Sequence, residues 1–248
     1  TSTLCDPISN EPDFKFSAVR VEAIGPKRKK ILVVGAGAAA LEFIHSYRKL
    51  NKQDEIHVFG REPHLFYNRV LLPDYINNEK NWESIVSSEK QELSDLKITY
   101  HQGMAISSID RDKKQIFDST GEAHSYDTLI LATGSRPALT MKTPQGMKGF
   151  FGLRTRRDAD NIREYLKNGG KASIIGGGLL GLELAGSLAS LGIEVTIIQR
   201  SSRLMRGQLD DTGSDILHDE IINRGIRVIY NDEVANFVGK GKLEAIKL

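Results

Sequence analysis

Two glycine-rich turns, each placed between an apolar run and a helix-like run, constrain the fold of this chain more than any other feature. The first is GAGAAA at residues 35–40 and the second is GGGLLG at residues 176–181, so the two turns begin 141 residues apart. A turn of this kind between a strand and a helix, followed by a second parallel strand, is typical of the β-α-β unit that holds a dinucleotide. The repeat therefore predicts an α/β chain with two tandem Rossmann-like dinucleotide-binding domains.

The segments around the turns set the expected elements and domains. Short apolar runs predict buried strands, and apolar residues at helical spacing predict helices. Strands are expected at residues 31–34, 55–59, 127–133, 172–175, 194–198 and 226–230, with shorter strands within 97–117; helices are expected at 38–50, 179–191 and 210–223, and a further helix is expected to begin at Asp158. The predicted domains are 30–146 and 147–248, preceded by a tail at 1–29 and joined by a linker at 143–149.

Composition excludes several classes of function. The 34 Lys and Arg residues against 32 Asp and Glu give a net charge of +2, which provides no field to attract nucleic acid. No apolar run approaches the roughly 18 residues of a membrane span, and no signal segment opens the chain. We therefore expect a soluble, cytoplasmic protein with no membrane partner. Cys5 is the single cysteine, so any redox chemistry must belong to a bound cofactor rather than to a cysteine pair.

The first turn has the residues that a dinucleotide diphosphate requires. Gly35 permits the tight turn, Gly37 lets backbone N–H groups approach the diphosphate, and the following helix supplies positive potential at its N-terminus. An acid that binds the ribose is expected near position 60, which is Gly60. Glu62 is the nearest carboxylate and the candidate substitute; the alternative is that Glu62 is an exposed loop residue.

The second turn is a full GxGxxG followed two residues later by Glu183, so its match is the stronger one. Gln199 stands where an NAD-selective site has an acid, and an arginine after it could pair with a 2′-phosphate. NADPH, or both nicotinamides, is therefore at least as well supported as NADH alone, unless the arginines face solvent. The candidate residues for this second nucleotide are Gly176, Gly178, Leu179, Leu180, Gly181, Gln199, Arg200 and Arg203.

Three motifs in order carry a family resemblance: GxGxxA at 35–40, YDTLILATG at 126–134, and GxGxxGxE at 176–183. This order resembles the FAD- and NAD(P)H-dependent pyridine nucleotide oxidoreductases. The resemblance implies that the first domain holds FAD and that the second presents NAD(P)H to the flavin. Together with the first turn, the candidate FAD residues are Gly35, Gly37, Ala38, Ala39, Glu62, Arg69, Ala105, Ala132, Thr133, Gly134 and Arg136.

Two local segments narrow the resemblance to particular branches of that family. Residues 62–72 and 204–210 are similar to the flavin region of the nitrite reductase large subunit and of rubredoxin reductases. This similarity implies that Arg69 lies by the FAD diphosphate. Tyr67 and Leu72 are expected to pack in the core instead.

The same resemblance implies a flavin that converts a hydride into single electrons. The cysteines of the disulfide-active and peroxidase branches are absent, and Asp74 stands where oxygenase-type ferredoxin reductases have a Lys. NAD(P)H would reduce FAD, which would pass electrons to a metal-centre acceptor, as in assimilatory nitrate or nitrite reductase. Glu183 is the candidate catalytic residue beside the nicotinamide, or else it only complements the helix dipole. A rubredoxin or ferredoxin reductase, and a truncated non-catalytic nucleotide-binding module, are the alternatives.

Both ends of the chain suggest a longer protein. Residues 5–21 resemble the closing segment of a molybdopterin-dependent nitrate reductase, the alternative being a polar leader. In the former case molybdopterin and iron–sulfur or siroheme centres belong to the full-length enzyme. Family members also continue with a Gly-Asp segment that contacts the flavin, which implies that this chain is C-terminally incomplete and binds FAD weakly or not at all. The terminal acceptor, the choice of NADH or NADPH, and the oligomeric state stay open.

Overall fold

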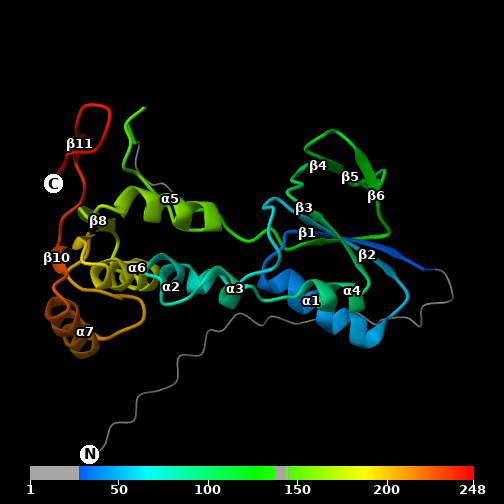
Figure 1. The fold of residues 1–248 in the computed structure, drawn as a ribbon, viewed down its shortest axis with the longest axis horizontal. Coiled ribbons are helices and arrows are strands. Elements are labelled where there is room, and N and C mark those ends of the chain that lie inside the picture. Colours follow the sequence, from blue (N-terminus) through cyan, green and yellow to red (C-terminus); the bar gives the residue numbers. More distant parts are fainter. Residues whose placement is uncertain (1–27, 138–142, 145) are drawn as a thin grey trace, which may run out of the picture.

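A four-stranded parallel sheet carries the first glycine-rich turn. The computed structural model describes residues 28–137, 143–144 and 146–248. Within them β1 (Lys30–Val34), β2 (Glu55–Gly60), β3 (Ile98–Gln102) and β7 (Thr128–Leu131) lie in the order β3-β2-β1-β7, and α1 (Ala38–Leu50) connects β1 to β2 (Figure 1). Strand order reverses beside β1, which is the arrangement of a dinucleotide-binding unit. Continuous apolar residues form β1 because its centre is buried on both faces.

A second parallel sheet carries the second turn. It consists of β8 (Lys171–Ile175), β9 (Glu194–Gln199) and β10 (Arg227–Tyr230) in the order β10-β9-β8. The helices α5 (Arg156–Leu166), α6 (Leu179–Ser190) and α7 (Asp211–Asn223) accompany this sheet, and Figure 1 shows them in the lobe opposite the first sheet. The predicted α/β architecture with two Rossmann-like units is therefore confirmed.

Two small antiparallel sheets complete the described chain. β4 (Ile106–Asp110), β5 (Gln115–Asp118) and β6 (Ala123–Ser125) form a meander, and β11 (Asn236–Val238) pairs with β12 (Ala245–Lys247). Ile116 of the meander is fully buried with Leu32 of β1 and Phe59 of β2. The meander thus packs on the first sheet, beside the end of β2.

Short helices fill the connection between β2 and β3. They are a 3₁₀ turn at Arg69–Leu71, α2 (Leu72–Ile76), α3 (Trp82–Ile85) and α4 (Lys90–Asp95). Although α2 belongs to the first predicted domain by sequence, its residues Leu72, Tyr75 and Ile76 join the buried cluster of the second lobe. Figure 1 shows α2 alongside α6. The two lobes therefore share apolar core.

Some predicted boundaries were wrong by a few residues. The expected strand at 127–133 is shorter, since β7 ends at Leu131 and the chain then turns through Gly134. The helix expected to begin at Asp158 begins at Arg156, because Thr155 caps it. The Thr155 hydroxyl accepts from the Asp158 backbone N–H at 3.2 Å, and the Asp158 carboxylate accepts from the Thr155 N–H at 2.8 Å.

The structure bears on two further expectations to different extents. The segment 5–21, which resembles a molybdopterin enzyme, lies outside the described residues. Among the helices of residues 28–137, 143–144 and 146–248, none combines the length and the apolar character needed to cross a bilayer.

Candidate functional site

A cleft of about 370 Å³ lies at the carboxyl ends of the strands of the first sheet. This is where nucleotides bind in open parallel sheets, because neighbouring loops diverge at the point where strand order reverses. Seven residues predicted from sequence line it: Gly35, Glu62, Arg69, Ala105, Thr133, Gly134 and Arg136. Four do not: Gly37, Ala38 and Ala39 lie in the entry to α1, and Ala132 lies at the end of β7 behind Gly35.

The two glycines of the first turn differ in what surrounds them. Gly35 has φ +112°, and a Cβ there would lie 2.1 Å from the backbone oxygen of Ala132. Gly37 is the N-cap residue of α1, and a Cβ there would meet nothing within 4 Å. Gly37 offers no side-chain cap and the first turn of α1 has no acid, so the N-terminal N–H groups of a 13-residue helix are free for an anion.

Glu62, Tyr67 and Arg69 form one hydrogen-bonded group on the cleft wall. Arg69 Nη2 lies 2.8 Å from Glu62 Oε1, and the Tyr67 hydroxyl donates to Glu62 Oε2 at 2.7 Å. Burial, followed by this hydrogen bond, raises the pKa of the Tyr67 hydroxyl, so it stays protonated. Tyr67 and Leu72 are buried, as expected. Both carboxylate oxygens of Glu62 are therefore paired with protein groups. Sequence spacing had suggested Glu62 as a ribose ligand but gave no sign of these partners.

The missing ribose acid at position 60 has a steric cause. A Cβ on Gly60 would lie 2.7 Å from the Tyr100 hydroxyl and 3.0 Å from the Cβ of Ala36. Tyr100 is fixed there because its hydroxyl donates to the backbone oxygen of His64 at 2.8 Å, and burial raises its pKa to about 12. Tyr100 lines the cleft but was not predicted. Tyr100 is the middle residue of β3, and no motif marks it, so sequence spacing gave no signal for it.

The second turn repeats this division of roles. Gly176 has φ +103° and donates to the backbone oxygen of Ile198 at 2.9 Å, and a Cβ on Gly181 would lie 2.2 Å from the oxygen of Gly176. A Cβ on Gly178, the N-cap of α6, would meet nothing within 4 Å. The next two predicted residues, Leu179 and Leu180, are exposed. The turn thus offers an open helix N-terminus for a second diphosphate.

The predicted selectivity residues behave differently from one another. Gln199 Oε1 accepts from the Gly177 N–H at 2.8 Å and its Nε2 donates to the Arg203 backbone oxygen at 3.1 Å, so the amide braces the turn. Arg203 forms an ion pair with Asp211. Arg200 is exposed directly after β9. Of the two predicted arginines, Arg200 therefore has the freer side chain.

Glu183, the predicted catalytic residue, lies in the first half of α6. Its Oε2 is buried without a hydrogen-bond donor among the described residues. Buried carboxylate oxygens almost always have a partner, so this atom is a candidate to meet a ligand.

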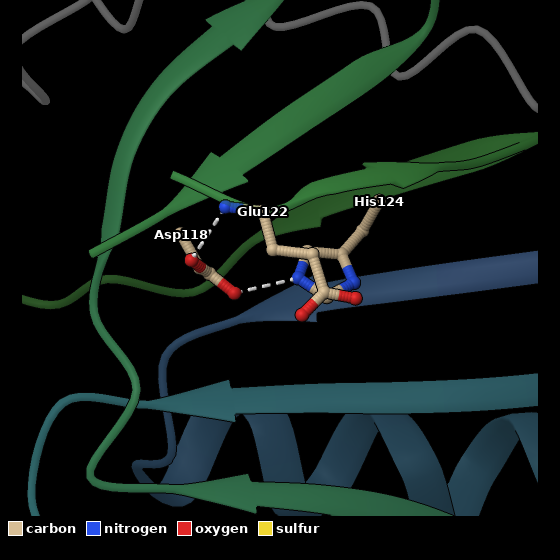
Figure 2. Close-up of side chains that lie close together, drawn as sticks. All are labelled: Asp118, Glu122 and His124. Carbon is tan, nitrogen blue, oxygen red and sulfur yellow. Dashed lines mark hydrogen bonds and ion pairs between the residues drawn. The ribbon is translucent and has the colours of Figure 1, made fainter. Parts of the chain in front are cut away.

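Asp118, Glu122 and His124 form a separate cluster at the β5–β6 turn, with ligand-type atoms within 4.8 Å of one another (Figure 2). Both oxygens of Asp118 are already used. Its Oδ1 accepts from Thr120 at 2.6 and 2.8 Å and from the Glu122 N–H at 3.1 Å, and its Oδ2 accepts from His124 Nε2 at 2.8 Å. The bond from His124 is the largest cause of the lowered pKa of this carboxyl. The cluster therefore closes the turn as a structural unit.

Comparison with known proteins gives a consistent set of relatives. The family model described as pyridine nucleotide-disulphide oxidoreductase matches residues 29–248. The assimilatory nitrate reductase electron transfer subunit of Bacillus subtilis is 34% identical over 221 residues, which are 89% of this chain and 29% of that protein. The nitrite reductase (NADH) large subunit of Escherichia coli is 33% identical over 217 residues, 86% of this chain and 25% of that protein.

A solved structure is similar over most of the chain. The crystal structure of NADH:rubredoxin oxidoreductase from Clostridium acetobutylicum superposes with a TM-score of 0.73 at 31% identity, covering 84% of this chain and 54% of the other. The chain thus spans about a quarter to a half of the proteins it matches.

Proposed function

The chain belongs to the pyridine nucleotide-disulphide oxidoreductase family, and from this premise we propose that it is an FAD-dependent NAD(P)H oxidoreductase module. In this proposal it passes electrons to a metal-centre acceptor of an assimilatory nitrate or nitrite reductase. The names of the relatives from Bacillus subtilis and Escherichia coli support this direction of electron flow. With Cys5 as the single cysteine of the sequence, no disulfide within these 248 residues takes part.

One observation carries the proposal: the cleft has a cation on its wall and lies directly beside an open helix N-terminus. Gly35 and Ala36 line the cleft together with Arg69, and Gly37, which follows them, leaves room for a diphosphate at the α1 N-terminus. Thr133 and Gly134, which follow β7, line its other side. These residues fit the diphosphate and adjoining riboses of FAD. When bound, FAD supplies the step from two-electron to one-electron transfer.

The second turn is assigned to NAD(P)H on the same grounds. Gly176 and Gly178 shape the turn, and the N-terminus of α6 faces the diphosphate. Arg200 is placed to meet a 2′-phosphate, with Gln199 neutral beside it, so we propose that NADPH is accepted at least as well as NADH. Glu183 is assigned to the nicotinamide end, where its unpaired oxygen would accept a hydrogen bond.

The acceptor lies beyond the residues that line these two sites. We propose a metal centre in the same polypeptide or in a small redox protein, with molybdopterin and iron–sulfur or siroheme centres belonging to the full-length enzyme. A rubredoxin or ferredoxin reductase is the second candidate, favoured by the likeness to the clostridial rubredoxin enzyme. We further propose that the protein works in the cytoplasm without nucleic-acid or membrane partners.

Dye reduction tests the proposed function. The purified chain is supplied with FAD, and the reduction of ferricyanide by NADPH and by NADH is followed. Because the chain is expected to bind FAD weakly, FAD is supplied in excess; we expect slow turnover that requires both FAD and a reduced nicotinamide, and that falls at least about tenfold in Arg69→Met because the diphosphate loses its cation. Arg224→Met, at the exposed end of α7, is the matched control. A folded chain that neither binds FAD nor turns over would instead support the non-catalytic module.

A further inference from the structure

The Tyr67 side chain lies between the cleft of the first sheet and the second lobe, which is the part of the chain built on the β10-β9-β8 sheet. Its ring is 3% exposed, and its hydroxyl has three partners. It donates to Glu62 Oε2 at 2.7 Å, accepts from Arg69 Nη1, and accepts from the backbone N–H of Arg156 at 3.2 Å. Glu62 and Arg69 line the cleft, whereas Arg156 begins α5 of the other lobe. The Tyr67 hydroxyl therefore contacts both the cleft wall and the start of α5.

A second set of hydrogen bonds also links the cleft to the residues before α5. Arg69 Nη1 also donates to the backbone oxygen of Arg154 at 3.1 Å. The Arg154 side chain lies beside Gly134, a residue that lines the cleft, since a Cβ on Gly134 would lie 3.0 Å from the Arg154 Nη2. A shift of the Arg69 guanidinium therefore acts on residues 154–156 by two hydrogen bonds, and these residues lead directly into α5.

We propose that the Tyr67 hydroxyl is a positioning group that couples occupation of the first cleft by a diphosphate to the docking of α5. The inference rests on the proposed function, because it takes the occupant to be a nucleotide diphosphate. A phosphate group reaching Arg69 competes with Glu62 for the guanidinium, and Tyr67 transmits the change to Arg156. Coupling of this kind is reciprocal, so docking of the second lobe also holds Arg69 ready for the diphosphate.

One tryptophan lies beside this contact between Tyr67 and Arg156, so its fluorescence can report on it. Trp82 is the single tryptophan. Its ring centroid lies 5.0 Å from that of Tyr67, and the Arg156 guanidinium lies 4.1 Å from its centroid. A movement of Tyr67 or Arg156 therefore changes the surroundings of the Trp82 indole, and the fluorescence emission of Trp82 should change with it.

The test compares Tyr67→Phe with Tyr75→Phe. Tyr75 is a matched control because its buried hydroxyl also crosses between lobes, donating to Asp160 Oδ1 at 2.7 Å, but it does not line the cleft. ADP and AMP are titrated calorimetrically, and Trp82 emission is recorded at saturation. ADP is used because it has the diphosphate without a flavin, which would quench tryptophan by energy transfer.

The expected result is a loss specific to the diphosphate. Tyr67→Phe should lower the affinity for ADP about tenfold, the worth of one hydrogen bond to a charged group, with AMP changed less than about twofold. ADP should change Trp82 emission in the wild type and in Tyr75→Phe but not in Tyr67→Phe. A merely structural role would weaken ADP and AMP equally and leave the emission change in place, and that result would overturn the inference.

Three other outcomes are equally decisive. If Tyr67→Phe does not fold, Arg69→Gln answers the same question, because it removes the cation while leaving Tyr67; an emission change equal to that of the wild type would refute the coupling. If the wild type binds neither ADP nor FAD, the proposed function fails, and the inference fails with it. ADP binding that Tyr67→Phe leaves unaltered sinks the inference alone.

Discussion

Glycines of the two turns serve two different physical purposes. Gly35 and Gly181 are packing positions, since a Cβ at either would lie 2.1 or 2.2 Å from a backbone oxygen. Gly37 and Gly178 are open positions where a Cβ would meet nothing within 4 Å, and both have extended backbone angles that any residue can adopt. Only the open positions can be changed without disturbing the fold, so they separate binding from stability.

The second turn gives the stability prediction. Gly181→Ala should lower the free energy of unfolding by about 1–3 kcal/mol, because the added methyl forces α6 away from β8. Gly178→Ala should cost less, about 0.5–1 kcal/mol, because Ala is only a poorer N-cap than Gly, yet it should weaken NADPH binding because it places a methyl group where the diphosphate approaches. Urea denaturation and nucleotide titration of the two variants check this. Equal stability of both variants would show that Gly181 is not a packing position.

Arg200 gives the selectivity prediction. Arg200→Ala should lower the affinity for NADPH about tenfold, the effect of losing one charge-assisted pair to the 2′-phosphate, and should leave NADH within about twofold. Arg203→Ala should have a smaller effect, because Arg203 is already paired with Asp211. The dissociation constants of both nucleotides, measured by fluorescence, decide the matter. A parallel loss for NADH and NADPH would contradict this assignment.

At the scale of elements, a column of histidines joins the first sheet to the meander. His57 of β2 and His101 of β3 lie 3.2 Å apart, Nδ1 to Nε2, and the His101 ring lies 5.9 Å from that of His124 on β6. Burial is the first cause that lowers the pKa of His57 and of His101, followed by Lys30 for His57 and by His124 for His101. Glu55 and Glu122 oppose these effects only in part.

The sign of the pH dependence follows from these lowered pKa values. As the pH falls through the ordinary histidine value of about 6.5, the unfolded chain takes up protons before the folded chain does, so stability present above that pH is lost below it. We expect the free energy of unfolding to fall between pH 7 and pH 5. His101→Phe, which keeps the stack on Phe59, should reduce that loss, and the remainder should come from His57 and from His64, whose pKa burial also lowers. Urea melts across this range test it, and an unchanged slope would argue against the histidine pair.

Elements with a strong local pattern were predictable, and those made by tertiary contacts were not. Apolar runs ending in glycine predicted β1 and β8, and α1 has the bounds expected from its spacing. α2 has only five residues and owes its burial to the second lobe, so no periodicity marks it. The pairing of Glu62 with Arg69 likewise depends on how the chain folds back after β2, which spacing does not encode.

At the scale of the molecule, α2 makes the two lobes energetically dependent on each other. Ile76 is 1% exposed and belongs to the buried cluster that also contains Ala185 and Leu188 of α6. A buried side chain shared between lobes stabilises both, because its removal leaves a cavity between them.

Truncation of that shared core should therefore be felt across the chain. Ile76→Ala should lower the free energy of unfolding by about 2–5 kcal/mol. The loss should appear in the second lobe although residue 76 lies in the first predicted domain. Hydrogen exchange of the α6 amides, with urea denaturation, measures this. Leu50→Ala, at an 83% exposed position, is the control and should change stability by less than about 0.5 kcal/mol. Protection of α6 that is unaffected by Ile76→Ala would show independent lobes.

The central claim is that the first turn holds a dinucleotide diphosphate against the N-terminus of α1. Its most direct test is the affinity for ADP, which carries a diphosphate without the flavin, of the wild type and of Gly37→Val, determined by calorimetric titration together with the melting temperature of each. The account predicts saturable binding by the wild type, at least about tenfold weaker binding by Gly37→Val, and melting temperatures within about 4 °C, because a side chain at position 37 has free space in the fold and Val is only a poorer N-cap than Gly. Equal affinity of the two proteins, or no binding by a folded wild type, would contradict it.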